Sequence, residues 1–212
     1  VGASLGLKGG YRSSVFSFLD TAGEDIGDQE KAFTLQYLAV ADDLIVILDP
    51  FMLPGARAMA NVPPAAIASA DTAPIAVLKR VTELLRVQHD VRQRKRIKVP
   101  IAVVFTKIDA FYPWLARVGP IMSDPSERAV YDEADGRAVH EEMLALLDRW
   151  NASDIDIHLR HNYENFRLFG VSALGGQPDY AANRVSGGGV RPHRVEDPIL
   201  WLLARSGGVP RA

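Results

Sequence analysis

The sequence predicts an α/β protein with a mainly parallel sheet and helices on both of its faces. Apolar, β-branched runs lie at residues 15–20, 43–49 and 99–106, and a weaker run lies at 166–171. The second and third runs are almost continuously apolar, as expected of parallel strands that are covered on both faces. Helical periodicity fills the gaps between the runs, and this alternation is typical of crossover units in a parallel sheet.

Three stretches carry the apolar spacing of amphipathic helices, at residues 75–91, 139–150 and 195–204. Pro198 is well placed in the first turn of the last of these. Two other stretches interrupt the rhythm. Residues 50–74 hold eight alanines and five prolines and predict a long loop or lid, and residues 175–192 predict a flexible loop rich in Gly, Asn and Pro. We read residues 1–212 as one domain.

Composition excludes several classes of protein. The 212 residues include no cysteine, which excludes a disulfide scaffold and any thiolate metal site. The net charge of −2 argues against a strong electrostatic attraction of the whole protein to nucleic acid or to a membrane surface. No nucleic-acid partner is therefore expected. No apolar stretch approaches the roughly 20 residues that span a bilayer. We therefore expect a cytoplasmic protein with no transmembrane segment.

A first candidate motif, Asp20-Thr21-Ala22-Gly23-Glu24, directly follows the first apolar run. A carboxylate at the end of a strand can hold Mg²⁺, and a glycine three residues later lets a backbone N–H approach a terminal phosphate. The structural alternative is a plain turn in which Asp20 caps the segment that follows.

Two further motifs follow later strands. In Thr106-Lys107-Ile108-Asp109, an Asp held in a loop can accept two hydrogen bonds from guanine, while the lysine stem lies along the base. The alternative is a surface pair of Lys107 and Asp109. Ser172-Ala173-Leu174 ends the next strand, where a small residue allows a backbone N–H to reach the base.

The order of these motifs, each at a strand end, resembles the Ras-like small GTPase superfamily, and the narrower match is to a bacterial group called double-GTPases. The resemblance implies a three-layer P-loop NTPase-like fold, GTP or GDP and Mg²⁺ as cofactors, and a switch protein with a protein activator or effector. It implies that Asp20 contacts Mg²⁺ and that residues 21–31 form the second switch. The nucleotide-binding residues that it implies are Asp20, Thr21, Gly23, Thr106, Lys107, Asp109, Ser172, Ala173 and Leu174.

Two departures from that family's pattern matter. Glu24 stands where the family usually carries a glutamine, so with Gly23 and Glu24 as the catalytic candidates we expect slow or partner-assisted GTP hydrolysis. No G-x-x-x-x-G-K-[ST] is present, and residues 6–10 read instead as a hairpin turn. The first strand and the phosphate loop are thus missing, and the domain is expected to be incomplete at its N-terminus. GTPase activity then depends on a preceding phosphate loop. The alternative is a non-catalytic, GTPase-like interaction scaffold that does not bind nucleotide.

Weaker signals complete the set. Residues 86–98 form a basic cluster, which reads as a solvated helix end or as a docking surface for an acidic partner. His158, His161 and Glu164 could share a helix face, but their spacing is not that of the H-E-x-x-H zinc helix. The tryptophans at 114, 150 and 201 are expected to anchor the core or an interface.

Overall fold

The computed structural model describes residues 2–7, 10–15, 38–60, 62–63, 73–125, 130–180, 182, 184–185 and 189–211. The strands are β1 (Gly2–Leu7), β2 (Gly10–Val15), β3 (Leu44–Leu48), β4 (Ile101–Phe105) and β5 (Phe166–Gly170). The α-helices are α2 (Pro54–Met59), α3 (Pro74–Gln88), α4 (Glu133–Arg149), α5 (Ser153–Asn162) and α6 (Asp197–Arg205). Two 3₁₀ helices, η1 (Pro50–Met52) and η3 (Ile108–Trp114), follow β3 and β4.

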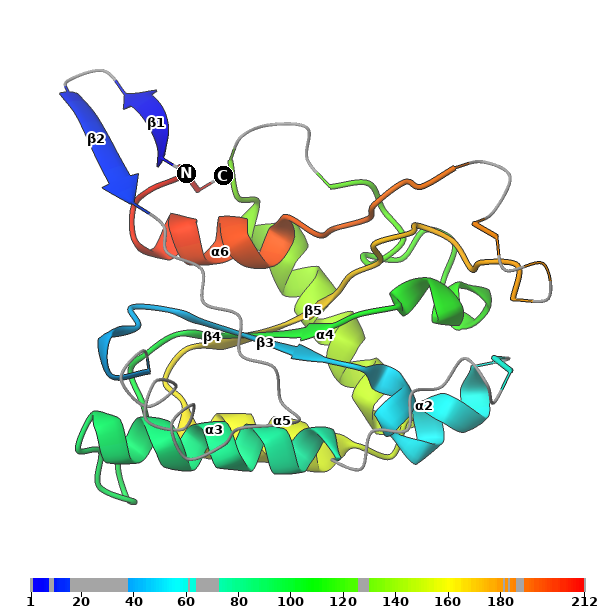
Figure 1. Cartoon of the computed structure of the whole chain (residues 1–212), viewed down its shortest axis with the longest axis horizontal. Coiled ribbons are helices and arrows are strands. Elements are labelled where there is room, and N and C mark those ends of the chain that lie inside the picture. Colours follow the sequence, from blue (N-terminus) through cyan, green and yellow to red (C-terminus); the bar gives the residue numbers. More distant parts are fainter. Residues whose placement is uncertain are drawn as a thin grey trace.

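The centre of the molecule is a parallel three-stranded sheet in the order β3-β4-β5 (Figure 1). Val46 pairs with Val103, which in turn pairs with Leu168, so the three strands are aligned across the sheet. All five residues of β4 are buried. The predicted runs at 43–49, 99–106 and 166–171 therefore form the sheet, and the α/β class with parallel strands is confirmed.

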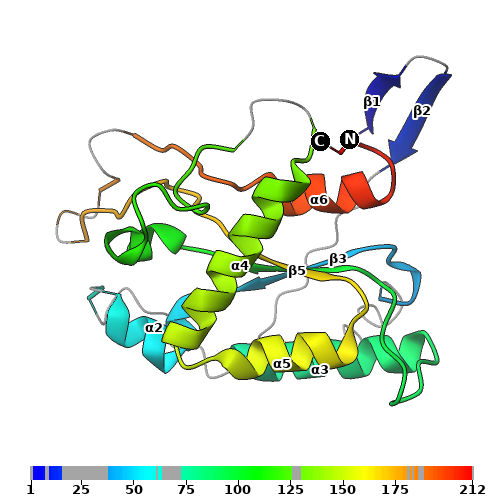
Figure 2. The same cartoon turned by 180° about the vertical axis from the view of Figure 1, so that it is seen from behind.

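Helices cover both faces of this sheet, with α3 and α5 on one side and α6 on the other (Figures 1 and 2). Because side chains alternate along a strand, Val103 faces the cluster that includes Leu78 of α3, whereas Val104 faces the cluster that includes Trp201 of α6. Helix α4 packs along β5. The larger of the two cores lies on the α3 and α5 side.

Local sequence explains where the helices begin. Pro74 and Pro198 occupy the first turns of α3 and α6, where a missing N–H costs nothing. The Asp132 side chain accepts hydrogen bonds from the N–H groups of Ala134 and Asp135 and so caps α4. Helix α4 thus starts at Glu133, ahead of the predicted residue 139. Helix α5 has weak apolar spacing, and its buried residues are Ile155, Leu159 and Asn162.

The two stretches that interrupt the predicted alternation of strands and helices, 50–74 and 175–192, have different structures where they are described. Residues 50–60 form η1 and α2, and Phe51 and Ala56 are buried in the core. Gly55 lies so close to Trp150 that a Cβ atom would come 2.2 Å from its carbonyl oxygen. In the described part of 175–192, Asp179 and Arg184 form an isolated β-bridge. No helix among the described residues is long and apolar enough to cross a membrane.

The N-terminal strands form an antiparallel hairpin in which Leu7 pairs with Gly10. The paired ends of the hairpin thus lie within the predicted segment 6–10. The hairpin lies on the same side of the sheet as α6 (Figures 1 and 2). Most of the apolar run at 15–20, and the candidate residues Asp20, Thr21, Gly23 and Glu24, lie outside the described residues.

Candidate functional site

The strand-end motifs at 106–109 and 172–174 meet at the carboxyl end of the sheet. Asp109 is 6% exposed and Ser172 is fully buried. The Ser172 hydroxyl donates a 2.5 Å hydrogen bond to Oδ1 of Asp109 and accepts one of 2.7 Å from the N–H of Gly175. Burial and then the Asp109 carboxylate raise the pKa of Tyr112 to about 12, so this phenol stays neutral.

Lys107 at the same end is held by its own chain. Its Nζ lies 2.5 Å from Oδ2 of Asp49, at the end of β3, and 5.1 Å from the centre of the Phe51 ring. Oδ1 of Asp49 accepts a hydrogen bond from the N–H of Phe51, so one carboxylate both caps η1 and pairs with the lysine. The predicted alternative of a Lys107–Asp109 pair is not found, because each residue contacts a different partner.

The other residues predicted here have backbone roles. Thr106 donates from its N–H and its hydroxyl to the carbonyl of Leu48. Ser172 exchanges two backbone hydrogen bonds with His193, and the carbonyl of Leu174 accepts from Arg191. Ala173 is exposed. These bonds tie the loop after β5 to the segment that leads into α6.

Metal binding finds no support among the described residues. No group of three His, Asp or Glu side chains there is arranged to hold an ion. His158 instead contacts the Thr82 hydroxyl through Nε2, at 2.8 Å, while His161 is exposed. The predicted metal ligand Asp20 lies outside the described residues.

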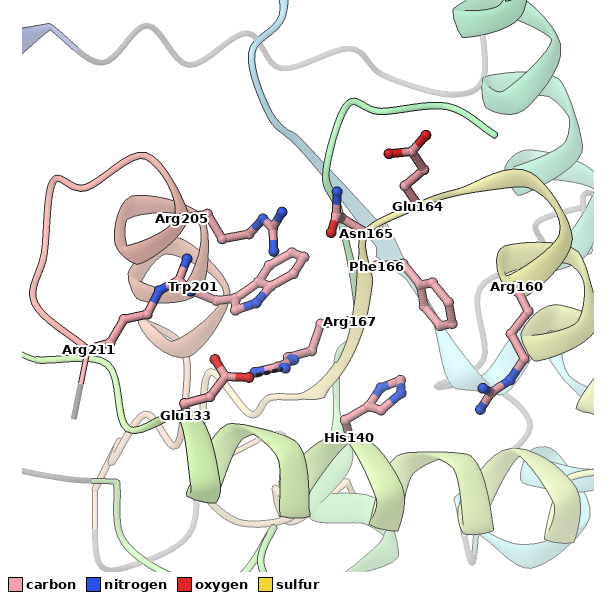
Figure 3. A pocket seen from close by; sticks show the side chains of 10 residues that line it. All are labelled: Glu133, His140, Arg160, Glu164, Asn165, Phe166, Arg167, Trp201, Arg205 and Arg211. Carbon is pink, nitrogen blue, oxygen red and sulfur yellow. Dashed lines mark hydrogen bonds and ion pairs between the residues drawn. The ribbon is translucent and has the colours of Figure 1, made fainter. Parts of the chain in front are cut away.

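A second cluster, which sequence reasoning missed, lies at the opposite end of β5. It surrounds a cavity of about 270 Å³ between α4, α5 and α6, which we call the arginine pocket (Figure 3). Its lining residues are Glu133, His140, Arg160, Glu164, Asn165, Phe166, Arg167, Trp201, Arg205 and Arg211. Four of them are arginines, contributed by α5, β5, α6 and the end of the described chain.

Arg167 is the fixed element of the arginine pocket. Its Nη2 donates to Oε1 of Glu133 at 2.7 Å (Figure 3). Its Nη1 donates to the Tyr131 hydroxyl, also at 2.7 Å. The guanidinium also lies 5.6 Å from the centre of the Trp201 ring. The hydrogen bond from Arg167 lowers the pKa of Glu133, and its effect outweighs that of burial, which raises it. The positive charge of Arg167 is therefore already compensated by the Glu133 carboxylate.

Arg205 and Arg211 are arranged differently. The Arg205 guanidinium lies 5.5 Å from the centre of the Trp201 ring, and Nε of Arg211 donates to the carbonyl of Ala204. Neither forms an ion pair with a carboxylate among the described residues. Burial and then the nearby Arg211 lower the pKa of Arg205, and the Asp43 and Glu133 carboxylates partly oppose this shift. The two cations therefore act on each other, while these carboxylates act on Arg205 without forming an ion pair with it.

A third charged cluster is structural. Arg194 is 1% exposed and has φ of 56°. Its guanidinium makes two hydrogen bonds to Asp135 and one to Asp197, and it also donates to the carbonyls of Pro120 and Ile121. The buried arginine thus joins the loop at 119–121 to the first turns of α4 and α6.

Comparison with known proteins gives one informative match. The chain is 31% identical over 223 aligned positions to SaeC of Mycolicibacterium smegmatis, which is named as a candidate ESX-1 scaffolding and assembly protein. The alignment covers 96% of this chain and 54% of SaeC, so the chain spans about half the length of that relative. No family model matches the chain. No solved structure matches it either.

This match corrects the resemblance to Ras-like GTPases, including the narrower one to double-GTPases. The relative that aligns with nearly the whole chain is named for scaffolding and assembly, and not as a GTP-binding hydrolase. The expected GTPase identity was therefore wrong. The physical reason is that the motifs behind it are short, and in the fold Lys107 and Asp109 serve contacts with Asp49 and Ser172.

Proposed function

We propose that this chain is a non-catalytic interaction module that helps to assemble a protein complex. The observation that carries the proposal is the alignment of 96% of the chain with a protein named for ESX-1 scaffolding and assembly. By this proposal the chain acts by binding protein partners and undergoes no nucleotide-driven switch.

The arrangement of charge at the carboxyl end of the sheet supports this proposal. Asp109 is nearly buried and accepts a hydrogen bond from Ser172, while Lys107 is paired with Asp49. Buried polar groups that are satisfied within the chain stabilise one conformation of the loops that carry them. A cluster of this kind gives a scaffold a fixed shape.

The proposal is tested by replacing the matching half of SaeC with this chain in Mycolicibacterium smegmatis. We expect the chimera to co-purify with the same proteins as intact SaeC, and a SaeC deletion that lacks this half to lose them. A chimera that is folded but recovers none of these proteins would contradict the proposal.

A second measurement addresses nucleotide directly. Calorimetric titration of the chain with GTP and with ATP, each with Mg²⁺, is expected to give no binding heat. Saturable binding of either nucleotide, lost in Asp109→Asn, would instead show that the cluster at the carboxyl end is a nucleotide site.

A further inference from the structure

We propose that the arginine pocket binds an acidic peptide segment of a partner protein, with Arg205 and Arg211 as the groups that take its carboxylates. This inference deepens the proposed function, on which it rests, by naming the surface and the chemistry of the partner.

Two of the four arginines that line the pocket are paired with carboxylates, and two are not. Arg160 is paired with Asp156, and Arg167 with Glu133. Arg205 and Arg211 have no carboxylate in contact among the described residues, and both are exposed. Two neighbouring guanidinium groups repel each other, and a carboxylate placed between them removes that repulsion and accepts several N–H groups.

The size of the arginine pocket limits what it can hold. The cavity of about 270 Å³ lies below the usual range of small-molecule sites, which is roughly 300–1,000 Å³. It is formed at the surface by side chains from four separate elements. This volume suits one or two side chains of an extended segment better than an entire ligand.

The other side chains of the arginine pocket favour a peptide over a phosphate-bearing ligand. Glu133 and Glu164 line the same pocket, and these carboxylates disfavour a phosphate dianion or a nucleic-acid backbone more than a single carboxylate. Phe166 is half-buried there and stacks edge-on with His140, with ring centres 5.6 Å apart. Phe166 therefore offers an apolar contact for a neighbouring side chain of the segment.

The test uses a fluorescein-labelled peptide of alternating glutamate and leucine and measures its fluorescence anisotropy with the full 212-residue chain. We expect saturable binding that weakens as salt is added, because the attraction is between partly exposed charges. A matched peptide with glutamine in place of every glutamate should not bind. Failure of the acidic peptide to bind, or equal binding of both peptides, would overturn the inference.

Two charge-reversed variants show where on the protein the peptide binds. Arg205→Glu with Arg211→Glu is expected to weaken peptide binding by about tenfold or more. The control, Arg94→Glu with Arg96→Glu, makes the same change of charge in the exposed part of the 86–98 basic cluster and should bind as the wild type does. A larger loss in the control would place the peptide on that cluster and contradict the inference.

Two further measurements keep the result unambiguous. Arg205→Gln with Arg211→Gln removes the charges with less disturbance of Trp201, and its thermal unfolding should match that of the wild type while its peptide binding is weakened. Sodium phosphate should displace the peptide only at ionic strengths at which sodium chloride displaces it as well. Displacement by phosphate at far lower concentration would identify a phosphate site and overturn the peptide assignment.

The outcomes separate this inference from the proposed function. If the SaeC chimera recovers its partners but the Arg205 and Arg211 variants recover them equally and bind the peptide unchanged, the inference fails and the proposed function stands. If the wild-type chimera recovers no partner, the proposed function fails whatever the peptide does.

Discussion

The carboxyl end of the sheet and the arginine pocket both gather charged side chains, but they compensate the charge in different ways. At the carboxyl end, Lys107 is paired with Asp49, and Asp109 accepts from a fully buried Ser172. In the arginine pocket, Arg205 and Arg211 contact no carboxylate among the described residues. Charged side chains that are paired within the chain stabilise its folded shape. Charged side chains that contact no group of opposite charge are available to a partner.

The buried Arg194 is the extreme case of internal compensation, so its removal should have the largest effect on stability. Arg194→Ala leaves Asp135 and the largely buried Asp197 without their shared cation. We expect a loss of about 3–5 kcal/mol in the free energy of unfolding, measured by urea denaturation. Arg191→Ala, at an exposed position nearby, is the control and should change little. Equal effects would show that the Arg194 network contributes no more than an exposed side chain.

Two glycines allow the two regions to be compared by the same substitution. Gly175 has φ of 72°, and a Cβ there would lie 1.8 Å from the carbonyl oxygen of Arg191. We expect Gly175→Ala to cost about 1–3 kcal/mol, because both the backbone conformation and a backbone contact oppose it. Thermal unfolding measures this change.

The matched variant beside the arginine pocket is Gly136→Ala in α4. A Cβ there would lie 1.8 Å from the hydroxyl of Tyr131, a buried side chain that accepts a hydrogen bond from Arg167. Since this obstacle is a side chain and not backbone, and since alanine favours the helix over glycine by about 1 kcal/mol, the net loss should be smaller than at Gly175. Movement of Tyr131 would disturb its hydrogen bond from Arg167 and alter peptide binding. A greater loss of stability for Gly136→Ala than for Gly175→Ala would contradict this expectation.

The bond between Ser172 and Asp109 can be measured with a double-mutant cycle. Ser172→Ala removes the donor to Asp109 and the acceptor for the N–H of Gly175, so we expect a loss of about 1–2 kcal/mol. The cycle with Asp109→Ala, which removes the acceptor, should give a coupling energy of at least about 0.5 kcal/mol. Additive effects would mean that the contact does not stabilise the carboxyl end.

The smallest expected effect is a pH dependence that arises beside the arginine pocket. Burial and then the Arg167 cation lower the pKa of His140, and its Nδ1 accepts a hydrogen bond from the N–H of Leu168. The unfolded chain therefore binds a proton near pH 6.5 more readily than the folded chain does. Stability should be full above this pH and fall as the pH drops through it, until the folded-state pKa is reached. His140→Gln should reduce the slope of melting temperature against pH, and an unchanged slope would exclude His140 as its source.

The sequence predicted the sheet better than it predicted the site. The strands around Val46, Val103 and Leu168 were found because buried parallel strands have nearly continuous apolar runs. Helix α6 was found from its apolar spacing and Pro198, and the buried Trp150 and Trp201 confirm two of the three expected anchors. Trp114, at 36% exposed, is not a core residue.

The arginine pocket could not be predicted because its residues lie far apart in the sequence. Arg167 and Arg205 belong to different elements, and no local motif links them. Arg194 follows a stretch rich in Gly and Pro, where a charged residue normally indicates a solvated loop, and its burial depends on carboxylates at 135 and 197. Helix α5 was missed because only Ile155 and Leu159 supply its buried apolar side chains.

The most direct test of the account is recovery of SaeC partners by three chimeras that carry the wild-type chain, the Arg205→Glu/Arg211→Glu variant and the Arg94→Glu/Arg96→Glu control. We predict that the wild type and the control recover the same proteins and that the pocket variant, although folded, loses at least one of them. Equal recovery by all three would contradict the claim that this chain binds a partner through the arginine pocket.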